Sequence, residues 1–172
     1  MVQFSVQVQA NTAGVETAVR TLSERLADSP TAFPDERLLF HLYSSVFDFG
    51  LISALISALR DRFPGSRLVF ATTTGAAFDY EYQTGIVVAV EAFAHPDSRV
   101  EVCAYDLART TEQEAAEEIA AYVRANPWVK AIKLLPFRVT KYLPFSFKFQ
   151  LSRSSRATKP CSKRRALAFS TA

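Results

Sequence analysis

The chain has 172 residues, of which 49% are hydrophobic and 22% charged, a composition typical of a globular protein with one sizeable core. It contains no run of about 18 apolar residues, and its first residues alternate polar and apolar side chains. The sequence therefore predicts neither a transmembrane helix nor a signal peptide. Two cysteines, Cys103 and Cys161, are too few for a disulfide framework, so a reducing, cytoplasmic location is expected.

The net charge of +3 is divided unevenly along the chain. All 17 acidic residues lie at or before Glu118, together with eight arginines, which gives this part a net charge of −9. The remainder has twelve basic residues, no acidic ones and every lysine of the chain. Such a basic end attracts nucleic acid or anionic membranes nonspecifically, but it lacks any reader motif. No specific nucleic-acid partner is expected.

The first third of the chain reads as strand, helix and strand. Residues 2–9 place apolar side chains on one face and polar ones on the other, which predicts a half-buried strand. Asn11 or Thr12 is expected to cap a helix with one apolar stripe, formed by Val15, Val19, Leu22 and Leu26. A loop at residues 31–36 precedes a nearly continuous apolar run, residues 38–43, which predicts a strand buried on both faces. His41 in that strand is expected to be a neutral core histidine.

A helix and a second buried strand follow. The helix is predicted from about Phe49 to Phe63, ends at Pro64-Gly65, and leads to a short strand at residues 68–71. Residues 78–84 are left as a loop or an edge strand with alternating aromatic side chains. Residues 85–94 and 99–106 are expected to be strands that pair antiparallel across the turn that begins at His95.

The last predicted elements are a helix capped by Thr110 or Thr111 and a strand at residues 129–135. After Pro136 no sustained period remains, and residues from about Leu151 are expected to be poorly ordered. These patterns predict an α/β fold, a mixed β-sheet flanked by helices and incomplete at its C-terminal end. The expected domains are residues 1–135 and a basic tail at 136–172.

Two polar turns follow the predicted strands at residues 38–43 and 68–71. In a βαβ unit the two strands are parallel, so both turns open at one edge of the sheet, where α/β proteins bind ligands. The threonine hydroxyls and a close backbone approach at Gly75 could hold a small anion such as a carboxylate. Alternatively, the threonines satisfy local backbone groups, and Asp48 or Ser45 caps the following helix. The expected ligand-binding residues are Tyr43, Ser44, Ser45, Asp48, Thr72, Thr73, Thr74 and Gly75.

Other chemistry is weakly supported by the residues. Two isolated histidines, His41 and His95, and two distant cysteines do not predict a metal site, and no cofactor motif is present. Asp79 and Glu81 could act as paired carboxylates, although a solvated loop is the simpler interpretation. No catalytic residue is therefore predicted, and an enzyme acting at the same crevice is the less favoured alternative.

The central stretch LLFHLYSSVFDFGLISALISALRDRFPGSRLVFATTTGAAF, followed by GIVVAVEAF and VKAIKLL, resembles the N-terminal half of FIST domains. The first turn, the helix ending in RFPGS and the TTTG turn come in that family's order and spacing. In the family the second turn ends in Gly-Glu, whereas here Gly75 is followed by Ala76, and Phe70 replaces a Gly that often precedes the run. The resemblance covers about residues 2–135.

The resemblance implies a cytoplasmic, non-catalytic sensory module of a signal-transduction protein that binds a small ligand such as an amino acid. It also implies an output domain in the same chain, such as a diguanylate cyclase or a histidine kinase, and neither follows here. The tail resembles nothing in the family. An alternative is therefore a non-functional fragment of a larger sensor, truncated or frame-shifted after about Leu135.

Overall fold

The structure is a computed structural model that describes residues 1–73, 76–78, 81–106, 110–137 and 146–154. The chain forms two compact units, an N-terminal unit from Met1 to Pro96 and a C-terminal unit from Asp97 to Ala172. The domain boundary expected near Leu135 falls inside a strand of the C-terminal unit.

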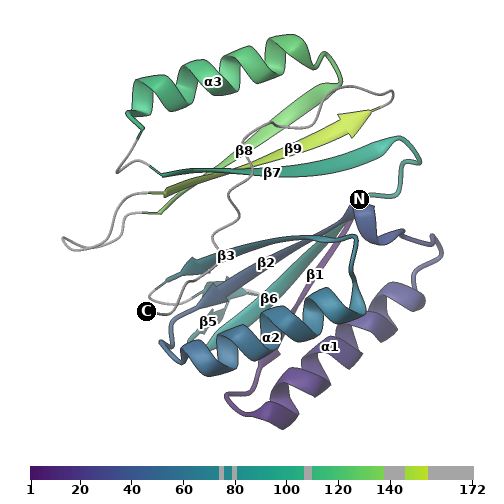
Figure 1. The fold of residues 1–172 in the computed structure, drawn as a ribbon. Helices are drawn as coiled ribbons and strands as arrows, with labels where there is room; N and C mark the ends of the chain where they lie inside the picture. Colours follow the sequence, from purple (N-terminus) through teal and green to yellow (C-terminus); the bar gives the residue numbers. More distant parts are fainter. Residues whose placement is uncertain (74–75, 79–80, 107–109, 138–145, 155–172) are drawn as a thin grey trace. The chain divides into compact units, whose positions relative to one another are not determined.

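The N-terminal unit contains a four-stranded mixed sheet (Figure 1). Its strands are β1 (Val2–Val8), β6 (Ile86–Ala92), β2 (Leu38–Ser44) and β3 (Arg67–Thr72), in this spatial order. β2 and β3 are parallel, and β6 pairs antiparallel with both β1 and β2. The predicted α/β fold with a mixed sheet is confirmed.

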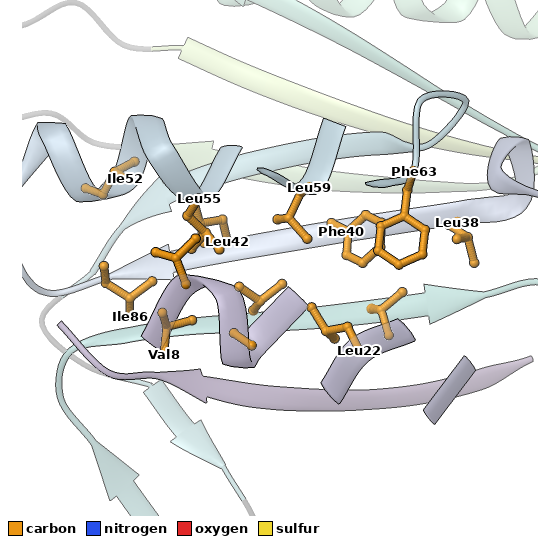
Figure 2. Packing of buried hydrophobic residues seen from close by; sticks show 14 of the residues in the cluster. Val8, Leu22, Leu38, Phe40, Leu42, Ile52, Leu55, Leu59, Phe63 and Ile86 are labelled. Carbon is orange, nitrogen blue, oxygen red and sulfur yellow. The ribbon is translucent and has the colours of Figure 1, made fainter. Parts of the chain in front are cut away.

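Two helices, α1 (Thr12–Ala27) and α2 (Phe49–Arg62), cover the same face of this sheet, and the short 3₁₀ helix η1 (Asp35–Arg37) precedes β2 (Figure 1). Their apolar stripes pack against alternate residues of the strands, as Figure 2 shows. Each fully buried aliphatic or aromatic side chain contributes about 1.5–3 kcal/mol relative to an exposed one. The core side chains include Val8, Leu22, Leu38, Phe40, Leu42, Ile52, Leu55, Leu59, Phe63 and Ile86.

The opposite face of the sheet is also buried at its centre, which explains the nearly continuous apolar sequence of β2. Leu39, Val69 and Val87 lie on this face. His41 is 2% exposed, which confirms its expected place in the core. Its Nε2 lies 3.3 Å from Glu91 Oε1 on β6, without the geometry of a hydrogen bond.

The predicted pairing of residues 85–94 with residues 99–106 is wrong. β6 lies between β1 and β2, so both of its edges are occupied within the N-terminal unit. β7 (Ser98–Asp106) belongs to the other sheet, where it pairs with β9. The turn at His95 therefore connects two units rather than two strands of a hairpin.

Two short strands include Phe78 and residues 81–83 of the segment predicted to be a loop or an edge strand. β4 (Ala76–Phe78) pairs antiparallel with β5 (Glu81–Gln83) in a separate two-stranded sheet. The alternating segment therefore supplies a strand, although not at the edge of the main sheet.

The C-terminal unit contains a three-stranded antiparallel sheet in the order β7-β9-β8 and the helix α3 (Glu112–Ala125) (Figure 1). β8 (Val129–Phe137) confirms the predicted last strand. β9 (Ser146–Ser154) was not predicted and includes Leu151, where a poorly ordered tail was expected to begin. Its sequence SFKFQLSRS alternates apolar and polar residues, a period-two signal too short to stand out beside the prolines before it.

The start of α3 is fixed by a capping box. The Glu114 N–H donates to Thr111 Oγ1 at 3.2 Å, and the Thr111 N–H donates to Glu114 Oε2 at 2.8 Å. Thr111 is therefore the cap.

None of the helices among the described residues is long and apolar enough to cross a membrane.

Candidate functional site

The first polar turn lies beside Thr72 and Thr73, the described residues of the second turn, where the parallel strands of the four-stranded sheet end. The last residues of the parallel strands, Ser44 of β2 and Thr72 of β3, are partners in the register. The Thr73 N–H donates to the Ser44 carbonyl at 2.8 Å, which holds the two turns together just beyond the sheet. The proximity predicted from the βαβ pattern is confirmed. We call this region, residues 44–48, 72–73 and 85, the candidate edge.

Ser44 is fully buried, and its hydroxyl forms hydrogen bonds within its own turn. Ser44 Oγ donates to the Val46 carbonyl at 2.6 Å and accepts from the Val46 N–H at 3.1 Å. Short serine side chains commonly satisfy backbone groups two residues away in this manner. Ser44 therefore shapes the candidate edge from beneath, and a ligand would contact other groups.

Ser45 joins the first turn to the start of β6, a connection that the sequence did not indicate. The Ser45 N–H donates to the Gly85 carbonyl at 2.9 Å, and the Gly85 N–H donates to Ser45 Oγ at 2.6 Å. Gly85 has a φ of 108°, a backbone conformation that is strained for every residue with a Cβ atom but not for glycine. The only sequence signal was a glycine immediately before a strand, and its partner lies 40 residues away.

Asp48 is the N-cap of α2, as one of the two readings of this turn predicted. Its Oδ1 accepts from the Leu51 N–H at 3.0 Å, and its carbonyl accepts from the Ile52 N–H at 3.0 Å. The side chain is exposed. The positive end of the α2 dipole therefore lies at the candidate edge, where it favours a negative group.

A second helix also begins here. β1 ends at Val8, whose partner Ile86 is in turn paired with Ser44, so the chain enters α1 at the candidate edge. The Asn11 side chain caps α1 by accepting from the Gly14 N–H at 2.7 Å. The positive ends of two helix dipoles therefore lie at this end of the sheet.

The remaining predicted ligand-binding residues differ in exposure, and two of them lie outside the described residues. Thr72 is exposed and Thr73 half-exposed at the end of β3, whereas Thr74 and Gly75 lie outside the described residues. Tyr43 is half-buried and stacks on His41, with ring centroids 6.1 Å apart and planes inclined by 5°. The structure thus places Ser45, Asp48, Thr72 and Thr73 at the same end of the parallel strands β2 and β3, while Tyr43 stacks on a neighbour on its own strand.

The other candidate residues for chemistry were His95, Cys103, Asp79 and Glu81. Among the residues that the structure describes, no three His, Cys, Asp or Glu side chains are grouped to hold a metal ion. His95 is exposed, and Cys103 is half-buried in the C-terminal unit. The side chains of Asp79 and Glu81 lie outside what the structure describes.

The C-terminal unit has its own polar cluster around Glu101, a buried carboxylate on β7. The Tyr122 hydroxyl on α3 donates to Glu101, and Arg99 forms an ion pair with it. The Arg99 guanidinium also lies 5.7 Å from the centroid of the Trp128 ring. Asn126 accepts from Trp128 Nε1 at 3.0 Å and donates to the Tyr122 carbonyl at 2.7 Å. These contacts join α3 to its sheet.

Comparison of the chain with protein-family models, with curated proteins and with solved structures found no match.

Proposed function

We propose that the N-terminal unit is a non-catalytic module that binds a small ligand at the candidate edge. The observation that carries this proposal is the register of β2 and β3, which places the Ser45–Asp48 turn beside Thr72 and Thr73. In open α/β sheets the carboxyl ends of parallel strands are the usual ligand-binding position. Hydroxyls, a carboxylate and two helix N-termini supply the polar groups.

A carboxylate-bearing ligand fits these groups best. The N-terminal turns of α1 and α2 favour a negative group, and the exposed Thr72 hydroxyl can donate to it. The Asp48 carboxylate can accept from an ammonium group, because only its Oδ1 is used in capping within the part of the chain described here. An amino acid carries both groups.

A binding role is favoured over catalysis by how the hydroxyls are used. Ser44 and Ser45 both hydrogen-bond to the backbone of the turns they build, and Asp48 is fixed as a helix cap. A nucleophile would need a general base within hydrogen-bond reach. The resemblance to FIST domains supports the same role: a cytoplasmic sensory module of a signal-transduction protein whose output domain is a diguanylate cyclase or a histidine kinase.

The test is a thermal-shift screen of the full chain with the common amino acids. A binding ligand at 100 times its Kd stabilises the folded state by about 2.7 kcal/mol. We expect at least one amino acid to raise the melting temperature of the wild type. If a cooperatively melting protein responds to none of them, the proposed function is wrong.

Two variants test whether the ligand binds at the candidate edge. Asp48→Asn keeps an oxygen for the α2 cap and removes the charge, and Thr72→Val removes a hydroxyl with little change of volume. We expect each to weaken the ligand's effect. Asp61→Asn, at the other end of α2, and Thr31→Val, in the loop after α1, are the matched controls and should leave it unchanged.

A further inference from the structure

Two large apolar side chains are exposed on either side of Asp48. Phe47 is 70% exposed and Phe49 is 60% exposed. The other exposed large apolar side chain in the described part of the N-terminal unit is Met1, at the start of the chain. Single exposed apolar residues are ordinary, but here two exposed phenyl side chains directly precede and follow the exposed carboxylate of the candidate edge in the sequence.

The arginines of the N-terminal unit are kept away from these two side chains. Arg37 binds the Ala94 and His95 carbonyls at the opposite end of β2, and Arg67 begins β3 at that same end. Arg60 and Arg62 lie in the last turn of α2. Arg20 pairs with Glu24, and Arg25 contacts the Ser5 carbonyl and the Phe4 ring. The unit contains no lysine.

This distribution discriminates between classes of small anion. Phosphate and dicarboxylate sites ordinarily use Arg or Lys to neutralise the ligand. At the candidate edge the side-chain charge within the described residues is that of Asp48, and positive potential comes from helix N-termini alone. A ligand with one carboxylate and one ammonium group matches one negative side chain and the partial positive charge of the helix N-termini. A more highly charged anion would lack a cationic side chain to neutralise it.

The surroundings of Asp48 leave its carboxylate approachable. Gly50 follows it within the first turn of α2 and has no side chain, and a Cβ atom there would lie 3.4 Å from Asp48 Oδ1. An ammonium group bound by Asp48 would place the rest of the ligand beside Phe47 or Phe49. Aromatic rings cover apolar groups well and also attract ammonium groups to their faces.

We propose that the candidate edge selects amino acids with an apolar side chain, with Asp48 binding the ammonium group and Phe47 and Phe49 covering the side chain. This inference rests on the proposed function and names the ligand class of the same site. The carboxylate of the bound amino acid then lies toward Thr72 and the N-termini of α1 and α2. The competing explanation for the exposed side chains of Phe47 and Phe49 is that a second copy of the chain packs against them.

The experiment is calorimetric titration of the full chain with L-leucine, glycine, L-glutamate and 4-methylpentanoate, which is leucine without its ammonium group. We expect leucine to bind at least about tenfold more tightly than each of the other three. Phe47→Ser/Phe49→Ser should lower leucine affinity to that of glycine and leave glycine affinity unchanged. Ile132→Ser removes another exposed apolar side chain, in the C-terminal unit, and should change neither.

Three results would overturn the inference. The first is tighter binding of glycine or glutamate than of leucine, which would leave the proposed function intact. The second is equal loss of leucine and glycine affinity in the phenylalanine variant, with Phe47→Ser alone as the milder form if the double variant does not melt cooperatively. The third is concentration-dependent self-association, measured by sedimentation, that the double variant abolishes while leucine affinity stays unchanged. Failure of all the amino acids to bind would instead contradict the proposed function itself.

Discussion

Gly14 and Gly50 both lie in the first turn of a helix, but replacing them should have opposite effects. A Cβ atom at Gly14 would meet the Gln9 carbonyl oxygen at 2.3 Å, a backbone atom that cannot move aside alone. At Gly50 the nearest atom would be 3.4 Å away, an ordinary contact. We expect Gly14→Ala to lower the free energy of unfolding by about 1–3 kcal/mol, as overpacking does.

Gly50→Ala is the matched control for this prediction. Alanine restricts the unfolded chain and has the higher helix propensity, so we expect a gain of about 0.5 kcal/mol. Urea denaturation of both variants measures the two changes. Equal and favourable effects of the two substitutions would show that α1 does not approach Gln9 as closely as the structure shows.

Ser45 and Gly85 should act as one unit in stability. Gly85→Ala forces a residue with a side chain into a positive φ, at a cost of about 1–2 kcal/mol. Ser45→Ala leaves the Gly85 N–H without its described acceptor, at a cost of about 1–3 kcal/mol. Because either change disturbs the same junction, the double variant should lose less than the sum. Strict additivity in urea denaturation would mean that the junction is not coupled.

The sequence identified the polar residues of the candidate edge, but it could not distinguish which of their atoms are available. Ser44, Ser45 and Asp48 were equivalent candidates as residue types. The structure separates them because Ser44 bonds within its own turn and Ser45 bonds to Gly85, which is distant in sequence. Local patterns report residue chemistry, whereas hydrogen-bond partners depend on the fold.

At the level of elements, the start of α3 should respond to acid through Glu114. The backbone N–H and the side chain of Thr111 donate to the Glu114 carboxylate and hold its pKa below its ordinary value of 4.5. A carboxyl group whose pKa is lowered by folding stabilises the folded state above the unfolded pKa. This stabilisation should be lost as the pH falls from about 4.5 through the folded pKa.

Carboxyl titration by NMR measures this effect directly. We expect a Glu114 pKa below 4.5 in the wild type and a partial rise in Thr111→Val, which removes the hydroxyl but keeps the backbone donor. A Glu114 pKa at or above 4.5 in the wild type would contradict the capping box.

The elements show where periodicity is sufficient and where it is not. Apolar faces of the right period predicted β1, α1, α2 and α3, and α3 also has a capping signal. Short, nearly continuous apolar runs predicted β2 and β3. The pairing of β6 was predicted wrongly because a strand buried on both faces carries no information about its neighbours. β9 was missed because its alternation follows a proline-rich segment.

At the level of the whole molecule, β9 decides what a shortened chain retains. It lies between β7 and β8, so a chain that ends at Phe137 loses the central strand of its second sheet. Hydrogen exchange of this shortened chain should show lost amide protection in β7 and β8 and full protection in β1, β2 and β6. Retained protection in β7 and β8 would contradict the position of β9.

A chain that ends at Pro96 tests the independence of the N-terminal unit. All four strands of its main sheet and both covering helices lie before this residue. We expect cooperative thermal unfolding of this polypeptide, measured by circular dichroism. A gradual loss of signal without a transition would show that the unit needs the rest of the chain.

Amide chemical-shift mapping with L-leucine on the isotopically labelled full chain locates the ligand on the molecule. We expect shifts of the Ser45–Gly50, Thr72–Thr73 and Gly85 amides, and none at Arg37 and Arg67 at the opposite end of the strands. Asp48→Asn should reduce these shifts at the same leucine concentration. Shifts confined to the opposite end of the strands or to the C-terminal unit, or no shifts at saturating leucine, would contradict ligand binding at the candidate edge.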